Sequence, residues 1–383
     1  MIKRIFPVLG ISIFASMLGI GIIAPLLPLY AEDLGATGIW IGIIFASFSI
    51  SRAIFIPIVG RLSDQNGRKV FICSGLFSYA VISLGYVWAS STAELTIIRL
   101  LHGAAGGMII PIAQAYIGDL SPEGEEGRWM GYFNTAFFAG FGFGPLLGGV
   151  LTDTFDMASA FYTMGILNLI AFLLALRFLP ETRQKGNKAT SPKSSFRNMA
   201  TSGVLQGLFS YRLFYALGRG AFTCFLPIFA ASFLGLSPSQ IGIVLAFNIL
   251  LMSLFQAFSG VLADRCNRKG LVIAGGLINF LFLALITQAQ SFWQLLALAI
   301  LGSTGGALSM PAASAMTIEE GRRYGMGSAI AVFTMAMSLG MAAGPILGGV
   351  VADLLNVKTV FYMGAGVGLV GTGLFAWLTN KRS

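Results

Sequence analysis

The sequence has little charge and few of the residue types on which most enzyme chemistry depends. Only 10% of its 383 residues are Asp, Glu, Lys or Arg, and it contains one histidine and three cysteines. Hydrophobic residues make up 56% of the chain, and the mean hydropathy is +0.82. No soluble domain of this size needs so much apolar surface, so the composition indicates a polytopic membrane protein.

The scarcity and spacing of these residue types also exclude several classes of site. The three cysteines, Cys73, Cys224 and Cys266, form no C-x-x-C pair, so neither a disulfide framework nor a zinc site is expected. We find no Ser/His/Asp set, no metal-ligand cluster and no phosphate-binding loop, and therefore predict no enzyme, no metal and no cofactor. The formal net charge of +9 does not indicate nucleic-acid binding, because the cations stand in short clusters between apolar segments.

Apolar runs long enough to cross a bilayer as helices recur along the whole chain. They predict an all-α polytopic membrane protein with twelve transmembrane helices in two six-helix bundles. A polar segment, 181–204, would be a cytoplasmic linker between domains 1–180 and 205–383. The expected spans are 5–30, 38–60, 70–90, 95–118, 127–150, 158–179, 206–232, 239–262, 270–289, 292–315, 325–351 and 358–378.

Loop charges predict the orientation of these helices. If the helices alternate, nearly all loop cations fall on one side of the membrane, and the opposite loops carry mainly Asp and Glu, with Lys358 their single cation. Cytoplasmic loops are enriched in Lys and Arg, so both termini and the linker are expected in the cytoplasm. The cations on that side are Lys3, Arg4, Arg61, Arg68, Lys69, Arg128, the linker cations, Arg265, Arg268, Lys269, Arg322, Arg323, Lys381 and Arg382.

The two halves repeat each other at an offset of 200 residues. The stretch from Gly60 to Lys69 returns as Gly260 to Lys269, with Asp64 and Arg68 matched by Asp264 and Arg268. Gly67 is matched by Asn267, the non-glycine type that best tolerates positive φ, so we expect a turn at both. Gly140, Gly144, Pro145, Gly148 and Gly149 recur as Gly340, Gly344, Pro345, Gly348 and Gly349, and Asp119, Asp153 and Phe161 recur as Glu319, Asp353 and Phe361. A parallel repeat of two six-helix halves follows.

These residues resemble the major facilitator superfamily over the whole chain. Gly60-x-Leu-x-Asp64-x-x-Gly67-Arg68-Lys69 is similar to its signature loop between helices 2 and 3, and Arg99 to Gly107 is similar to its helix 4 motif. The glycines from 140 to 149 resemble the helix 5 motif of its drug:proton antiporter branch, and Gly19 to Pro28 resembles helix 1 of that branch.

The resemblance implies roles for two of these motifs. Asp64 would dock on the start of helix 11, and Arg68 would reach an acid at the end of helix 4, where Asp119 stands, to lock a cytoplasmic gate. The glycine motif of helix 5 would seal the interface between the halves against ion leak. From the residues alone, the first motif could be only a positively charged anchor, and the glycines could serve only tight helix packing.

Charges inside the expected spans need a functional or structural reason, because a central cation costs about 2.5–3.5 kcal/mol on insertion scales. Arg52, Arg219, Arg99 and His102 are such residues, and their repeat partners are uncharged. We predict that Arg52 and Arg219 line a substrate cavity, unless they are paired structurally or snorkel. Arg99 could be a structural hydrogen-bonding residue, and His102 either a proton carrier or a packing residue. All fifteen carboxylates fall in loops or at helix ends, although the antiporter branch commonly places an acid in the cavity.

The sequence thus predicts a secondary transporter that exports a small organic solute by alternating access, as in proton-coupled efflux of drug-like compounds. An organic-anion carrier using Arg52 and Arg219 is an alternative, and a non-transporting membrane sensor is a third. The expected partners are the solute, protons and the lipid bilayer, with no nucleic acid. We expect a multi-pass monomer in the cell (cytoplasmic or inner) membrane.

The orientation can be tested with single cysteines introduced into a chain whose three native cysteines are replaced by serine. Cysteines at positions 37, 91 and 156 should react with an impermeant thiol reagent from outside intact cells. Cysteines at 66, 190 and 266 should react only after permeabilisation, because the Lys and Arg clusters hold those loops in the cytoplasm. A mixed pattern would contradict the twelve-helix assignment.

Overall fold

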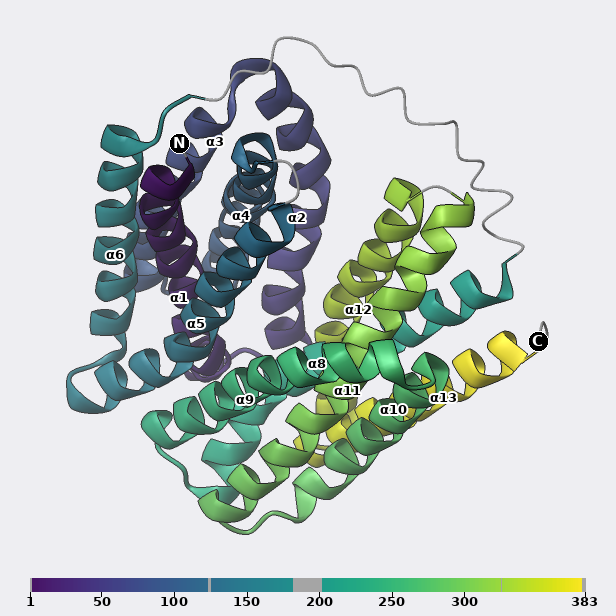
Figure 1. The fold of residues 1–383 in the computed structure, drawn as a ribbon. Helices are drawn as coiled ribbons and strands as arrows, with labels where there is room; N and C mark the ends of the chain where they lie inside the picture. Colours follow the sequence, from purple (N-terminus) through teal and green to yellow (C-terminus); the bar gives the residue numbers. More distant parts are fainter. Residues whose placement is uncertain (1, 123–124, 182–201, 325, 381–383) are drawn as a thin grey trace. The chain divides into compact units, whose positions relative to one another are not determined.

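The computed structural model describes residues 2–122, 125–181, 202–324 and 326–380 (Figure 1). Most of the predicted linker, 182–201, therefore lies outside the described residues, and the domain boundaries stay a prediction. The helices are α1 (Ile2–Asp33), α2 (Gly38–Asn66), α3 (Arg68–Trp88), α4 (Thr92–Leu120), α5 (Glu126–Thr154), α6 (Met157–Phe178), α8 (Gly203–Leu234), α9 (Pro238–Arg265), α10 (Arg268–Leu285), α11 (Phe292–Tyr324), α12 (Met326–Leu354) and α13 (Val357–Asn380), with a 3₁₀ turn at Ile286–Gln288.

Twelve helices of the described chain are long and apolar enough to cross a membrane. Each overlaps one of the predicted spans, and this confirms the all-α membrane fold. Lipid hydrocarbon offers no hydrogen-bond partners to the backbone, whereas an α-helix pairs its own amide and carbonyl groups. Long apolar segments in a membrane are therefore expected to be helical. Matching helices of the two halves begin 200 residues apart, as at Gly38 and Pro238 or Arg68 and Arg268.

The junction between the second and third helices differs from the prediction in two ways. Helix α2 continues to Asn66, so Asp64 lies in its last turn rather than in a loop. Gly67 alone separates α2 from α3 and has a φ of 94°, whereas Asn267 has a φ of −62°. Asn267 therefore keeps a negative φ, although its residue type tolerates a positive one. Its side chain instead accepts a hydrogen bond from the Gly270 amide at 3.3 Å and caps α10.

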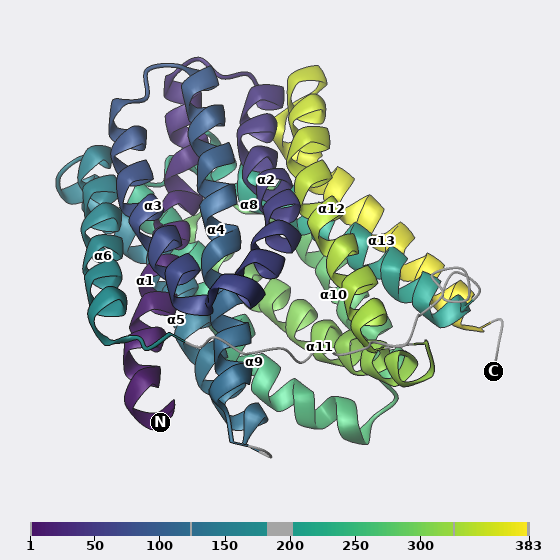
Figure 2. The same ribbon diagram turned by 90° about the horizontal axis from the view of Figure 1, so that it is seen from above.

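The chain divides into two compact units that do not follow the halves completely. Unit 1 comprises 1–36, 47–187 and 235–246, and unit 2 comprises 37–46, 188–234 and 247–383. The first nine residues of α2, Gly38 to Ala46, thus belong to unit 2, and the start of α9 belongs to unit 1. Within unit 1, α6 lies beside α1 and α3 (Figures 1 and 2).

The core of unit 1 depends on the close approach of α1 and α5. A Cβ on Gly144 would stand 2.5 Å from the Gly21 Cα and 2.5 Å from the Leu18 carbonyl oxygen. Gly140 and Gly148 meet backbone oxygens of the same helix α1. Small residues at every fourth position let two helix backbones come into van der Waals contact. In lipid this contact matters, because the hydrophobic effect does not drive helices together there.

Unit 2 repeats this packing with α8 and α12. Gly340 and Gly344 meet the carbonyl oxygens of Leu213 and Leu217, and Gly348 packs on Phe225 and Val360. The prolines of both motifs also serve the packing inside their units, because a Cβ on Gly21 or Gly220 would stand 3.0 Å from the Cδ of Pro145 or Pro345. The described structure thus places three glycines of each motif inside a unit.

Two glycine-to-alanine substitutions should separate packing from helix propensity. Gly144→Ala should lower the thermal unfolding midpoint in detergent, because an added methyl in a full contact costs about 1–3 kcal/mol. Gly118→Ala is the matched control, since no described atom lies within 4 Å of its Cβ position. That variant should be neutral or gain about 0.5–1 kcal/mol. Equal midpoints for the two variants would contradict the role of Gly144.

Candidate functional site

Arg68 joins three elements at the junction of α2 and α3. Its Nη1 lies 2.5 Å from the Asp64 Oδ1, and its Nε donates to the Asp119 Oδ2 at 3.0 Å. The same Nη1 donates to the Ser63 hydroxyl at 2.7 Å. One guanidinium therefore ties the end of α2 and the start of α3 to the end of α4, and the ion pair with Asp119 is largely shielded from solvent.

Unit 2 contains a looser copy of this junction. Arg268 lies 3.1 Å from the Glu319 carboxylate and 3.7 Å from the Asp264 carboxylate, and its Nε donates to the Ala263 carbonyl at 3.0 Å. Its side chain is more exposed than that of Arg68, 34% against 14%. Gly60 and Gly260 have no described atom within 4 Å of their Cβ positions, so neither marks a close backbone contact.

Two acids that the sequence analysis did not single out lie at or near these junctions. Glu181 accepts a hydrogen bond from the backbone amide of Lys69 at 3.1 Å, and its carboxylate lies against Gly67. Glu320 is only 5% exposed and accepts from the Ser202 hydroxyl at 2.9 Å. No spacing in the sequence indicates the contact of Glu181 with Lys69. Glu320 could have been noticed, because it directly follows Glu319, which the repeat had already singled out.

Asp353 and Asp153 form contacts that the sequence did not predict. They lie at the helix ends opposite to those that carry the arginine junctions. Asp353, at the end of α12, accepts hydrogen bonds from the backbone amides of Gly38 at 2.6 Å and Ile39 at 2.9 Å. It thereby caps the N-terminus of α2, where unpaired amides and the helix dipole attract negative charge. Gly349 and Gly42 make the backbone contacts beside this cap, against Gly38 and Pro345 respectively.

Unit 1 contains the corresponding contact at α9. Asp153, at the end of α5, accepts from the Ser239 amide at 2.9 Å and from the Ser237 hydroxyl at 2.8 Å. Gly149 meets the Pro238 carbonyl beside it. We call these two contacts, Asp353 on α2 and Asp153 on α9, the crossover caps. Each holds the first residues of a helix whose remainder belongs to the other unit.

Arg99 and His102 lie in a buried aromatic cluster of unit 1. His102 is fully buried, its Nδ1 is 3.0 Å from the Tyr86 hydroxyl, and its ring packs edge-on against Tyr79. The Arg99 guanidinium lies over the Phe48 ring at 4.5 Å. The His102 Nε2 has no hydrogen-bond partner among the described residues. This packing supports the structural interpretation of both residues, and a proton-carrying His102 stays a hypothesis.

Arg52 and Arg219 are the two predicted cavity residues, and they belong to different units. Both side chains are half-buried. The Arg52 Nε is buried without a hydrogen-bond partner among the described residues, and the Arg219 guanidinium lies 5.1 Å from the Phe222 ring centroid. In α9 of unit 2, the buried Asn248 amide donates to the Ala299 carbonyl and the Ser303 hydroxyl, and its Oδ1 has no partner among the described residues. That both arginines line one cavity stays a prediction.

A fourth intramembrane arginine, Arg212, was missed by the sequence analysis. It lies in α8 between α11 and α12, faces the sulfur atoms of Met310 and Met337, and has its guanidinium 4.8 Å from the Phe333 ring centroid. Its position seven residues before Arg219 was the available signal, because seven residues make about two helical turns.

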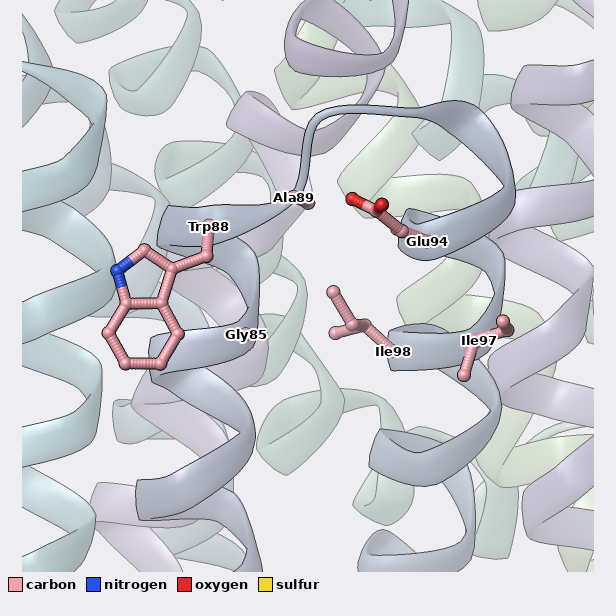
Figure 3. A pocket seen from close by; sticks show the side chains of 6 residues that line it. All are labelled: Gly85, Trp88, Ala89, Glu94, Ile97 and Ile98. Carbon is pink, nitrogen blue, oxygen red and sulfur yellow. The ribbon is translucent and has the colours of Figure 1, made fainter.

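A shallow surface pocket lies between the end of α3 and the start of α4. It is lined by Gly85, Trp88, Ala89, Glu94, Ile97 and Ile98 (Figure 3). The Glu94 carboxylate accepts from the Ser90 amide at 2.7 Å, and the Ser91 hydroxyl accepts from the Glu94 amide at 3.3 Å. These bonds form a capping box for α4, so the acid in this pocket has a structural role. No described group of three His, Cys, Asp or Glu side chains could hold a metal ion.

The fold and the helix-end contacts define the class of protein: a helical membrane protein whose two halves repeat each other. Residues 9–215 and 208–383 each match the Major Facilitator Superfamily profile. An MFS-type transporter of Methanocaldococcus jannaschii is 30% identical over 399 residues, with 99% of both chains covered. The chain therefore belongs to the major facilitator superfamily.

One further relative and two solved structures are similar to this chain, and the solved structures share its fold. The quinolone resistance protein NorA of Staphylococcus aureus is 28% identical, with 96% of this chain and 95% of NorA covered. A bacterial homologue of the human lysosomal transporter Spinster, in an inward-facing occupied conformation, superposes with a TM-score of 0.83 at 13% identity, covering 99% of this chain and 97% of that one. The nucleoside transporter NupG superposes with a TM-score of 0.81 at 18% identity, covering 97% and 98%.

The crossover cap of α2 can be tested by the accessibility of Ile41, which is 3% exposed at the start of that helix. In an Ile41→Cys chain without native cysteines, Asp353→Ala should raise the rate of thiol labelling roughly two- to fivefold. A cap of this kind contributes about 0.5–1 kcal/mol.

The matched control is Asp156→Ala, which removes a carboxylate that caps only its own helix α6, through the Ser159 amide at 2.7 Å. This substitution should leave the labelling of position 41 unchanged. Equal labelling rates in the Asp353 and Asp156 variants would show that Asp353 does not hold the start of α2.

Proposed function

We propose that this member of the major facilitator superfamily exports drug-sized organic solutes across the cell membrane in exchange for protons. The observation that carries the proposal is the similarity to the quinolone resistance protein over almost the full length of both chains. The duplicated arginine junctions support it, because a transporter that alternates between two states needs contacts that can form and break at helix ends.

With the orientation proposed from the loop charges, the two sets of helix-end contacts would lie on opposite sides of the membrane. The Arg68 and Arg268 junctions would face the cytoplasm together with both termini, and the crossover caps would face outside. Transport by rocking of two repeats requires contacts on one side to separate while those on the other close. The Arg68 junction would then stabilise the cytoplasmic gate, and the crossover caps the outer one.

Proton coupling would need a group that binds and releases protons during the cycle. Arg52, Arg99, Arg212 and Arg219 cannot do this near neutrality, because guanidinium stays charged. His102 and the partly buried acids at helix ends are the remaining titratable candidates. We propose a monomer as the transporting form, since each chain contains both repeats.

An organic-anion carrier is the second candidate function. It is supported by Arg52 and Arg219, neither of which is paired with a carboxylate among the described residues. Uptake of anionic, neutral and cationic solutes into proteoliposomes would separate the two candidates, and a chain that moves none of them would favour the membrane sensor.

The test is uptake of the fluoroquinolone norfloxacin into proteoliposomes with an acidic interior. Uptake should be faster with the pH gradient than without it, and a protonophore should abolish the difference. Asp64→Asn should lower the initial rate about three- to fivefold with normal expression, because an exposed ion pair is worth at most about 1 kcal/mol. Asp33→Asn, at the exposed end of α1, is the control and should transport normally.

Three results would each count against a part of this proposal. Norfloxacin uptake that is the same in protein-free liposomes would contradict export of this class of solute. Uptake that needs the protein and ignores the pH gradient would contradict proton coupling alone. Normal transport by Asp64→Asn would show that the junction of α2 and α3 is an anchor and not a gate.

A further inference from the structure

Helix α8 carries two guanidiniums on one face. Arg212 and Arg219 are seven residues apart, which places them about 20° apart around the helix and about 10.5 Å apart along it. Tyr215 lies between them on the same face and interacts electrostatically with both. All three residues belong to unit 2, so their arrangement is defined within one compact body.

Within the described part of the chain, no acid compensates either charge. The groups that act on the two guanidiniums from within the described structure are tyrosines, and no carboxylate is among them. Among the described residues, two thioether sulfurs are the only acceptors of Arg212, and its buried Nε has no partner. Thioether sulfur accepts hydrogen bonds weakly, so the donors of Arg212 are poorly satisfied. The Arg219 guanidinium lies 5.1 Å from the Phe222 ring centroid, and Tyr215 is the group that acts on it electrostatically.

The depth of Arg219 argues against a lipid headgroup as its counter-ion. It lies in the middle of α8, about 24 Å from the first residue of that helix. Arg219 is also half-buried, so the described residues do not enclose its side chain completely. An arginine held at this depth without an acid marks a binding or transport role more often than a structural one.

The surroundings of Arg212 suit an amphiphilic ligand. Met310 of α11 and Phe333 and Met337 of α12 flank its guanidinium with flexible and aromatic apolar surface. Methionine side chains adapt to ligands of different shape, and a forked guanidinium matches a carboxylate with two parallel hydrogen bonds. The same few residues therefore offer an anion-binding group beside an apolar wall.

We propose that Arg219, Arg212 and Tyr215 form a subsite for the carboxylate of a drug-sized amphiphilic solute. Arg219 provides the forked donors, Arg212 adds the second positive charge, and Met310, Phe333 and Met337 contact the apolar part. This inference rests on the proposed export function and names the chemical class of its solute. Fluoroquinolones, which carry one carboxylate on an aromatic ring system, are members of that class.

The test compares norfloxacin with its methyl ester, which differs only in the loss of the acidic group. Equilibrium dialysis against the purified full-length chain in detergent should show that the acid binds about tenfold or more tightly than the ester, because hydrogen bonds between charged groups are strong when desolvated. Arg219→Gln should remove this difference and leave ester binding within about twofold of the wild type, which also shows that the variant is folded.

Arg219→Lys should retain part of the preference, since it keeps the charge and loses the fork. Arg265→Gln is the control, because it removes an exposed cation at the end of α9 and should change nothing. Inorganic sulfate should compete only weakly with the acid, and competition of equal strength would reduce the subsite to a general anion site and overturn the amphiphile assignment.

Three other results would overturn the proposal: equal binding of acid and ester to the wild type, an equal loss of both in Arg219→Gln, or no saturable binding of the acid. The assay needs no gradient and no membrane crossing. Binding that follows the prediction in a chain that fails to export norfloxacin would therefore leave the subsite standing and reject only the proposed function.

Discussion

The cost of placing charge in hydrocarbon is the constraint on which this structure depends. The chain responds by keeping its described carboxylates at helix ends, where each can meet an arginine or an uncapped helix N-terminus. The acids therefore act as connectors between helices. Asp119 and Glu319 receive arginines at one end of their bundles, and Asp153 and Asp353 receive backbone amides at the other.

Duplication places these connectors in pairs, although the two members of a pair differ in strength. The Arg68 junction is closer and better shielded than the Arg268 junction, while the two crossover caps have nearly equal distances. Intramembrane cations do not follow the duplication, because Arg52, Arg99, Arg212 and Arg219 have uncharged repeat partners. A repeated scaffold with unrepeated cations is consistent with a common transport mechanism and a site particular to this protein.

Helix α8 shows how these two kinds of feature combine. Its contact with α12 depends on the glycines of a repeated motif, Gly340 and Gly344, which bring the two backbones together at Leu213 and Leu217. The same α8 segment carries Arg212 and Arg219, which belong only to the second half. Close packing on one face of the helix thus holds the charged face in a defined position, as a binding subsite requires.

The sequence by itself determined the helices and the repeat, because hydropathy and periodic glycines are local properties. The pairing of Arg68 with Asp119 was expected only from the resemblance to a family. The sequence could not determine that α2 continues through Asp64 or that Asn267 keeps a negative φ, since capping by Asn267 competes with a turn. Only the tertiary structure showed that Asp353 meets Gly38 and that Asp153 meets Ser239. Those contacts join residues 315 and 86 positions apart, and their geometry depends on how whole helices pack.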